Sequence, residues 1–203
     1  MSALKRFSFK TKDGKEFPVY EINPMPGKPK PENFIKALNE RLRKEYGPIN
    51  ERKGPDSGYN CHGMTFIGKL GWVGLSQKEV SSIIIPNNTK SINEQLEEKD
   101  IIEEILKGNG LKKKIRINNI EKQNLKGDED IEIGDIAIYR NSKRGREEIT
   151  HSAVVVELIK DKDDTKLEDF VLLSKMAEGG EYFHSYKKAS WEFGKILEVW
   201  SDR

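Results

Sequence analysis

The sequence predicts an α+β fold, in which N-terminal helices pack on an antiparallel β-meander. Up to about residue 110, apolar residues recur with the three- to four-residue spacing of amphipathic helices. From residue 131 onward, short apolar runs alternate with polar turns, as they do in successive β-strands. A helical first half followed by a series of strands is typical of the α+β class.

We expect one domain over residues 1–203, because the chain has the length of an ordinary domain. Its 36 basic and 34 acidic residues give a net charge of +2, so nothing indicates a nucleic-acid partner. No apolar run is long enough to span a membrane, and the N-terminus lacks the apolar core of a signal peptide. The sequence therefore predicts a protein made in the cytoplasm, with export by a signal-independent route left open.

Residues 1–30 are predicted to form a hairpin followed by an extended connector. Apolar residues on both sides of the turn signal Asp13-Gly14 favour a hairpin over residues 7–20. Four prolines between residues 23 and 31 exclude a helix or a central strand there. A helix is predicted over residues 32–46, where apolar residues share one face, and residues 47–60 have the composition of a loop.

Cys61 is predicted to begin a second helix, which has Asn60 as its N-cap and runs to about residue 72. Two further helices are predicted, one near residues 77–83 and one over residues 91–109. The basic run at 111–114 is interpreted as a solvated helix end. We therefore expect residues 77–130 to form a helical insertion in the domain.

The remaining apolar runs are predicted to be strands, at residues 133–139, 149–158, 170–175, 182–184 and 196–200. A charged turn at 141–148 separates the first two, and a polar turn at 160–166 follows the second. The run of four apolar residues at 153–156 indicates a strand that is buried on both faces.

The single cysteine of the chain lies at a predicted helix start. A lone cysteine is most often a small buried apolar residue, and it excludes an intrachain disulfide. A thiol becomes a nucleophile as the thiolate, and a helix N-terminus lowers its pKa. Gly63 would let the backbone or a substrate approach closely, and an amide near Cys61 could donate to an oxyanion. Together these features favour Cys61 as a nucleophile.

His151 is predicted at the beginning of a buried strand, where its side chain would lie at the rim of the sheet. An imidazole there could meet Cys61 in space, although the two residues are far apart in sequence. If the two strands on either side of the polar turn pair, His151 lies across from about Ser174 or Lys175. Ser174 can accept from the imidazole and is the predicted orienting residue. Two other residues stay open for that role: Glu178 and His184.

Three segments resemble the NlpC-type papain-like superfamily of cysteine peptidases, which includes the CHAP amidases. Residues 59–66 (YNCHGMTF) are similar to its cysteine helix, residues 132–139 (EIGDIAIY) to its first core strand, and residues 150–155 (THSAVV) to its histidine strand. The resemblance covers roughly residues 58–75 and 131–200. It implies a papain-like fold with Cys61 as nucleophile, His151 as base and Ser174 at the position of the third polar residue.

The resemblance also implies a function, because members of this superfamily typically cut amide bonds in peptidoglycan stem peptides. We expect a cysteine peptidase or amidase with a peptide or peptidoglycan substrate and no cofactor. The substrate site is then expected at Tyr59, Asn60, His62 and Gly63. Since no cell-wall-binding repeat is recognisable, an effector toxin or a phage-related enzyme is favoured, and an inhibitory partner protein is compatible with that role.

Two other functions stay open at this stage. One is a papain-like deamidase or acyltransferase that acts on a protein or lipid target. The other is a non-catalytic binding module on the same fold. A metal site is not predicted, because one cysteine and three histidines without paired spacing do not supply a tetrahedral zinc site.

Overall fold

The computed structural model of the protein describes residues 5–21, 32–47, 50–54, 60–69, 101–127, 129–143, 146–176 and 179–203. The helices are α1 (Glu32–Tyr46), α2 (Cys61–Ile67), α4 (Ile101–Gly108) and α5 (Ser190–Phe193). A separate hairpin consists of β1 (Lys5–Lys10) and β2 (Glu16–Glu21). The main sheet consists of β3 (Glu51–Lys53), β4 (Lys112–Ile117), β5 (Ile136–Lys143), β6 (Arg146–Lys160), β7 (Leu167–Lys175), β8 (Glu181–Ser185) and β9 (Ile196–Ser201).

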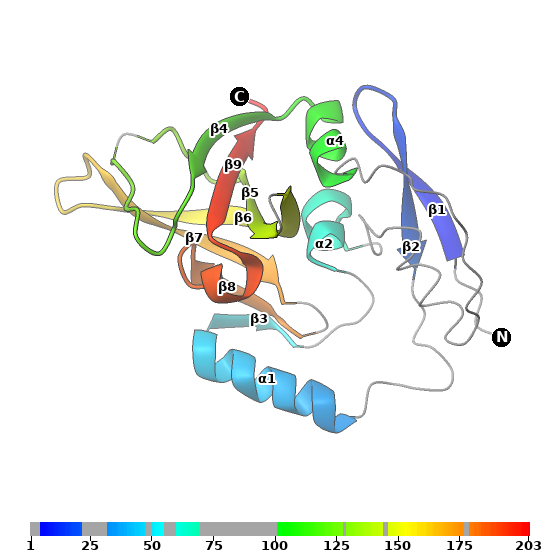
Figure 1. The fold of residues 1–203 in the computed structure, drawn as a ribbon, viewed down its shortest axis with the longest axis horizontal. Helices are drawn as coiled ribbons and strands as arrows, with labels where there is room; N and C mark the ends of the chain where they lie inside the picture. The colour runs from blue at the N-terminus through cyan, green and yellow to red at the C-terminus, as the bar shows by residue number, and fades with distance from the viewer. Residues whose placement is uncertain are drawn as a thin grey trace.

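The main sheet is antiparallel at every pairing, in the order β3-β8-β7-β6-β5-β9-β4. Figure 1 shows α2, α4 and the hairpin to one side of this sheet, and α1 beside β3. The predicted α+β class with a large antiparallel sheet is thus confirmed. The meander prediction holds for β5 to β8. The sheet then departs from a meander. Strand β9 pairs with the other edge of β5, and β4 pairs with β9.

Several local predictions are confirmed. The hairpin pairs Phe9 with Phe17 across a turn in which Gly14 has a φ of 90°. Helix α1 covers the predicted residues. Helix α2 begins at Cys61, but it ends at Ile67 rather than near residue 72, because Gly68 adopts the left-handed conformation and closes it. Residues 22–31 of the predicted connector and 70–100, which contain the predicted helix at 77–83, lie outside the described residues.

Three polar segments form strands, contrary to prediction. The basic run at 111–114 leads into β4 rather than ending a helix, so residues 112–117 belong to the main sheet and not to a helical insertion. The predicted loop at 47–60 contains β3. Within the predicted turn at 141–148, β5 continues to Lys143 and β6 begins at Arg146. The charged composition of these segments predicted turns and loops, but some of the charged side chains form ion pairs within the sheet. Lys113, for example, donates to Glu198 at 2.8 Å.

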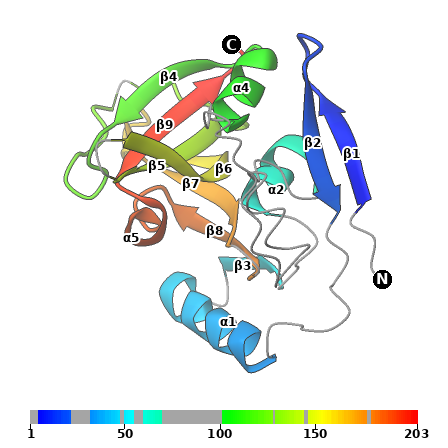
Figure 2. The ribbon, with the colours of Figure 1, turned by 45° about the vertical axis from the view of Figure 1, so that its right-hand side comes forward.

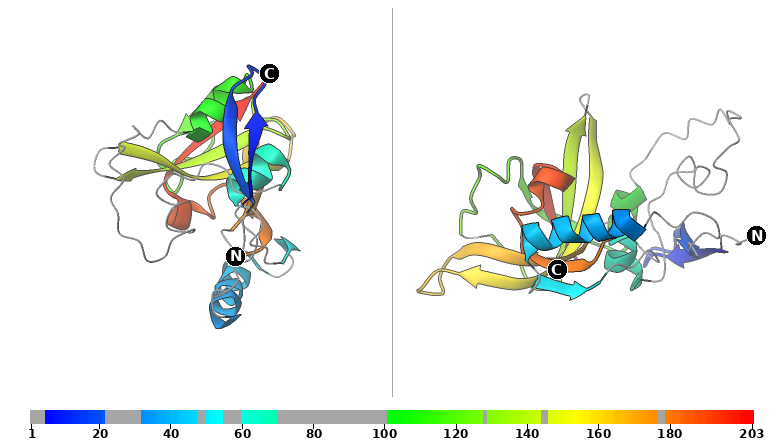
Figure 3. Two further views of the ribbon diagram at one scale, coloured as in Figure 1. Left: turned by 90° about the vertical axis from the view of Figure 1, so that its right-hand side faces the viewer. Right: turned by 90° about the horizontal axis from the view of Figure 1, so that it is seen from below.

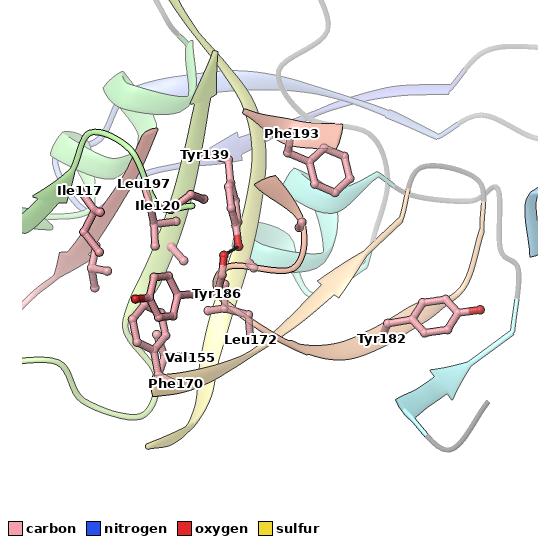
Figure 4. Close-up of a cluster of buried hydrophobic side chains, with 14 of the residues drawn as sticks. Ile117, Ile120, Tyr139, Val155, Phe170, Leu172, Tyr182, Tyr186, Phe193 and Leu197 are labelled. Carbon is pink, nitrogen blue, oxygen red and sulfur yellow. Dashed lines mark hydrogen bonds between the residues drawn. The ribbon is translucent and has the colours of Figure 1, made fainter. Parts of the chain in front are cut away.

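Successive residues on the central strands point to opposite faces of the sheet, and each face has its own core. The α1 face includes Tyr139 and Leu197, which pack in one core with Leu42 of α1 and Phe193 of α5. Figure 4 shows part of this core, including the hydrogen bond from the Tyr139 hydroxyl to the Tyr186 carbonyl at 2.6 Å.

The α2 face is the opposite side of the same strands. It includes Ile138 and Trp200, which pack against residues of α2, α4 and the hairpin. Figure 2 shows the hairpin standing beside α2 and α4, on the side away from α1. The right-hand view of Figure 3 shows the long β6–β7 pair projecting at one end of the molecule. The two faces are therefore covered by different helices.

We expect Gly194→Ala to lower the free energy of unfolding by about 2–5 kcal/mol, through backbone strain and a steric clash. Gly194 has a φ of 114°, and a Cβ atom there would lie 2.3 Å from the Arg140 carbonyl oxygen. Gly134→Ala is the matched control, since Gly134 has a φ of 97° with open space around it. Urea denaturation of both variants measures the difference, and equal losses would contradict the role given to the clash.

Candidate functional site

Cys61 is the first residue of α2, as the sequence predicts. The backbone at Asn60 is extended, and its side-chain oxygen accepts the N–H of Gly63 at 2.7 Å. This is the geometry of an N-cap, and it fixes where the helix begins. The predicted roles of Asn60 and Gly63 next to a substrate are untested, but both residues define the turn that presents the thiol. Tyr59 lies outside the described residues.

The first turns of α2 are anchored on β6 through Ser152. His62 Nδ1 lies 2.8 Å from the Ser152 hydroxyl, which also donates to the Thr65 hydroxyl at 3.0 Å. Thr65 in turn donates to the carbonyl of Cys61 at 2.9 Å. The imidazole of His62 is buried, and burial lowers its pKa to about 4. His62 is therefore neutral at pH 7 and holds the start of α2 on the sheet.

The thiol of Cys61 is subject to opposing electrostatic effects. Burial raises its pKa, and this effect is the larger one. Hydrogen bonding from the backbone at Ser152, at His62 and at Cys61 itself lowers it, as does the positive charge of Lys175. The net result is a raised pKa, so the thiol is protonated at neutral pH and needs a base to become a nucleophile.

His151 is the residue next to Ser152 on β6, but its side chain points to the other face of the sheet. It pairs in register with Tyr139 and stacks on Phe193, with ring centroids 3.7 Å apart and planes inclined by 5°. The Nε2 atom is buried and has no hydrogen-bond partner among the described residues. Burial and, to a lesser extent, the charges of His184 and His62 lower the pKa of His151 well below its usual value.

His151 is predicted to lie across from about Ser174 or Lys175, and the β6–β7 register shows that this pairing is wrong by one to two residues. Ser174 lies opposite Ala153 in the β6–β7 register, and its hydroxyl is 2.7 Å from His184 Nε2. His184 Nδ1 lies 2.9 Å from the carbonyl of Ser185, which can accept but not donate. Nδ1 therefore carries the proton and Nε2 accepts from Ser174. Burial lowers the pKa of His184 to about 4, so this imidazole is neutral at pH 7.

The structure thus brings some of the predicted site residues together and not others. Cys61 and His62 lie at the start of α2 against Ser152, on the α2 face. His151 belongs to the adjacent position of the same strand, but no hydrogen bond joins it to Cys61 among the described residues. Ser174 belongs to a separate pair with His184. Glu178, which stayed open as an orienting residue, lies outside the described residues.

A groove of about 510 Å³ lies over β6, β7 and β8. Val156 and Phe183 line it, and both also pack against the cluster formed by Met64 of α2 and Leu173 of β7. Met64 is three residues after Cys61, so the two side chains share one side of the helix. The side chains that line the groove are Asn50, Val156, Glu157, Ile159, Val171, Phe183, His184 and Ser185.

Two residues next to the start of α2 and the imidazole were not predicted from the sequence: Ser152 and Phe193. Ser152 had a detectable signal, because the residue after His151 on a strand must face the opposite side. Phe193 had none, since its position depends on the placement of α5. Within the described part of the chain, no group of His, Cys, Asp and Glu side chains could hold a metal ion.

Comparison with known proteins adds no relative: no family model, curated protein or solved structure matches the chain. Among the described residues, no helix is long and apolar enough to cross a membrane. Functional inference therefore depends on the residues around Cys61 and His151 themselves.

Proposed function

We propose that the protein is a papain-like cysteine hydrolase that cleaves an amide bond in a peptide or in peptidoglycan. Cys61 is the nucleophile and His151 is its base. The observation that carries this proposal is that the start of α2 is anchored on β6 at Ser152, whose hydroxyl lies 2.8 Å from His62 Nδ1, while the preceding residue, His151, has a buried Nε2 without a hydrogen-bond partner among the described residues. A buried nitrogen without a partner is costly, and a proton-accepting role would account for it.

The proposed reaction follows from the protonation states of the two groups. The Cys61 thiol is protonated and the His151 imidazole is neutral, so the imidazole can accept the thiol proton. The sulfur then attacks the carbonyl carbon, and His151 returns the proton to the leaving amine as the C–N bond breaks. A water molecule, deprotonated by His151, hydrolyses the resulting thioester and restores the thiol. Backbone N–H groups at the start of α2 are the donors for the oxyanion.

The proposal requires a movement of His151. Its ring now stacks on Phe193 on the α1 face, whereas α2 lies on the other face. The ring must leave Phe193, and the backbone of β6 at His151 must turn with it, because a side chain on one face of a sheet does not reach the other face by rotation of its own bonds. The stack with Phe193 is then a resting arrangement that keeps the imidazole uncharged.

Alkylation of Cys61 by iodoacetamide tests this function without knowledge of the substrate. We expect His151→Asn to slow alkylation at pH 7 by about tenfold or more, because the general base is lost. Cys61→Ser measures the background of the assay, since the chain has no other cysteine. His184→Gln is the matched control: it also removes a buried imidazole, but one bonded to Ser174, and alkylation should stay within twofold of wild type.

Hydrolysis is measured in parallel as the release of free amino groups from peptidoglycan sacculi and from unstructured peptides. Cys61→Ser should abolish the release, and His151→Asn should lower its rate by about 10²–10⁴-fold. Hydrolysis that survives Cys61→Ser would disprove the proposed nucleophile.

A second candidate function is a non-catalytic binding module on the same fold. It is favoured by the raised pKa of Cys61, caused mainly by burial, and by the absence of a hydrogen bond between Cys61 and His151 among the described residues. In that case Cys61 is a structural thiol. Alkylation would then be as slow as that of a model thiol, and His151→Asn would leave the rate unchanged.

A further inference from the structure

The groove over β6, β7 and β8 has apolar side chains on a face of the sheet that is open to solvent. Val156 and Ile159 of β6, Val171 of β7 and Phe183 of β8 line it. Ile159 is 39% exposed, and the other three are half-buried. The solvated face of an antiparallel sheet normally carries polar side chains, so four apolar ones in one groove indicate a surface that a partner covers.

The opposite face of the same strands is closed. Val155 and Phe170 have no exposed surface and belong to the core on the α1 face. On the groove side, α2 covers only the neighbouring part of the sheet, where Met64 forms a cluster with Leu173 and Val156 packs against that cluster. Neither the fold nor the proposed reaction at Cys61 uses the apolar side chains beyond this point.

Two carboxylates accompany the apolar side chains of the groove. Glu157 lines the groove and is exposed. Asp169 accepts a hydrogen bond at 3.0 Å from the hydroxyl of Ser185, which also lines the groove. Within the part of the chain that the structure describes, neither carboxylate forms an ion pair, and the nearby Lys160 pairs with Asp164 instead. The groove therefore combines apolar contact area with uncompensated negative charge.

We propose that this groove is the docking site for a segment of a partner protein that combines apolar side chains with lysine or arginine. The apolar side chains would cover the floor, and the cations would pair with Glu157 and Asp169, as complementary charges do across interfaces. A second copy of this chain fits less well, because a two-fold interface places the same patch against itself and sets like charges face to face. The inference does not depend on the proposed function, since it uses neither Cys61 nor His151.

The test is the binding of three fluorescein-labelled synthetic peptides of equal length to the full chain, measured by fluorescence anisotropy in low-salt buffer. The first peptide has a Val-Phe-Val centre flanked by lysines. The second has the same centre flanked by glutamates, and the third has a Ser-Asn-Ser centre flanked by lysines. We expect the first to bind at least about tenfold more tightly than either of the others, because it alone supplies both kinds of contact.

Two variants locate the binding in the groove. Glu157→Lys should weaken the binding of the first peptide at least about tenfold and strengthen that of the glutamate-flanked peptide at least about threefold, because the charge beside the floor is reversed. Ile159→Ser should weaken the binding of the first peptide at least about fivefold, because apolar contact area is lost. A structural role of Glu157 alone would not exchange the preference between the two peptides.

Each variant has a matched control. Glu168→Lys makes the same change in net charge as Glu157→Lys, but strand alternation directs Glu168 to the face opposite its neighbour Asp169. Ile133→Ser replaces the other large apolar side chain that is well exposed among the described residues, at 60%, and Ile133 lies in the turn before β5. Both controls should bind the first peptide within twofold of wild type. Circular dichroism establishes that each variant is folded.

Four results would overturn the proposal. They are no binding of the lysine-flanked apolar peptide, equal binding of the glutamate-flanked one, unchanged binding by folded Ile159→Ser, and a wild-type dimer in light scattering that Ile159→Ser dissociates. The last result would assign the groove to a second copy of the chain. None of these outcomes affects the proposed function, which alkylation and hydrolysis test at Cys61 and His151.

Discussion

The free energy of unfolding is expected to fall by about 4 kcal/mol when the pH is lowered from 7 to 5, since two buried histidines resist protonation. Burial lowers the pKa values of His62 and His184 to about 4, whereas a histidine in the unfolded chain titrates near 6.5. Between these two values the unfolded state binds more protons than the folded state, so stability rises with pH. Each histidine accounts for about 2 kcal/mol at pH 5.

The sign of the effect is the same for His151, whose pKa burial also lowers, so this residue adds to the loss. Above about pH 7 these groups are neutral in both states and stability no longer depends on them. Below about pH 4 His62 and His184 are charged in both states, and their contribution stays constant. Because a domain of this kind is stable by about 5–15 kcal/mol in total, a loss of this size is large.

Urea denaturation at pH 7, 6 and 5, followed by tryptophan fluorescence, measures this dependence. His62→Asn keeps a polar atom near the position of Nδ1 that meets Ser152, and His184→Gln keeps one near Nε2 that meets Ser174. Each variant should remove about 2 kcal/mol of the loss between pH 7 and pH 5. A double variant that still shows the full loss would contradict the assignment to these two imidazoles.

Glu198→Gln is expected to lower the free energy of unfolding by about 3–5 kcal/mol, because it breaks three ion pairs at a fully buried carboxylate, one of them with the buried Arg140. Glu198 has no exposed surface and lies on β9 at the centre of an ionic cluster. Its carboxylate accepts from Lys113 at 2.8 Å, Arg116 at 2.7 Å and Arg140 at 3.0 Å. Burial raises the pKa of Glu198, but its hydrogen bonds and ion pairs outweigh burial, and the net pKa is lowered.

Glu147→Gln is the matched control for this prediction. Glu147 also accepts from Arg116, at 2.5 Å, but its side chain is 39% exposed, so the pair is well screened by solvent. Its loss should cost about 1 kcal/mol or less. Chemical denaturation of both variants at pH 7 measures the contrast, and a loss for Glu198→Gln as small as that for Glu147→Gln would show that burial does not amplify this cluster.

The parts of the fold that were predicted correctly depend on local interactions. The N-cap at Asn60 needs only Gly63 three residues later, and the turn at Gly14 needs only a residue that accepts a positive φ. Such signals lie within a few residues, so a sequence displays them directly. The charged strand β4 was missed for the same reason, because its partner Glu198 on β9 is 85 residues from Lys113.

For the candidate site, too, the prediction that depends on neighbours in sequence was correct, and the one that depends on strand register was not. The position of Cys61 at a helix start follows from its neighbours in sequence, and the structure confirms it. The partner of Ser174 could not be predicted in this way, because the β6–β7 register is one to two residues away from the expected one and places the hydroxyl beside His184. A shift in register changes every cross-strand pair at once, and it is fixed by the packing of whole faces rather than by one residue.

The amino-acid sequence by itself determined that this chain is α+β, that its one thiol opens a helix and that a histidine stands on a buried strand. The tertiary structure alone decided that Ser152 anchors the start of α2, that Ser174 pairs with His184 and that His151 faces Phe193. The physical reason is the distance in sequence over which each kind of interaction acts. Caps, turns and apolar spacing act over a few residues, whereas the side of a sheet on which a group is buried depends on contacts between segments about a hundred residues apart.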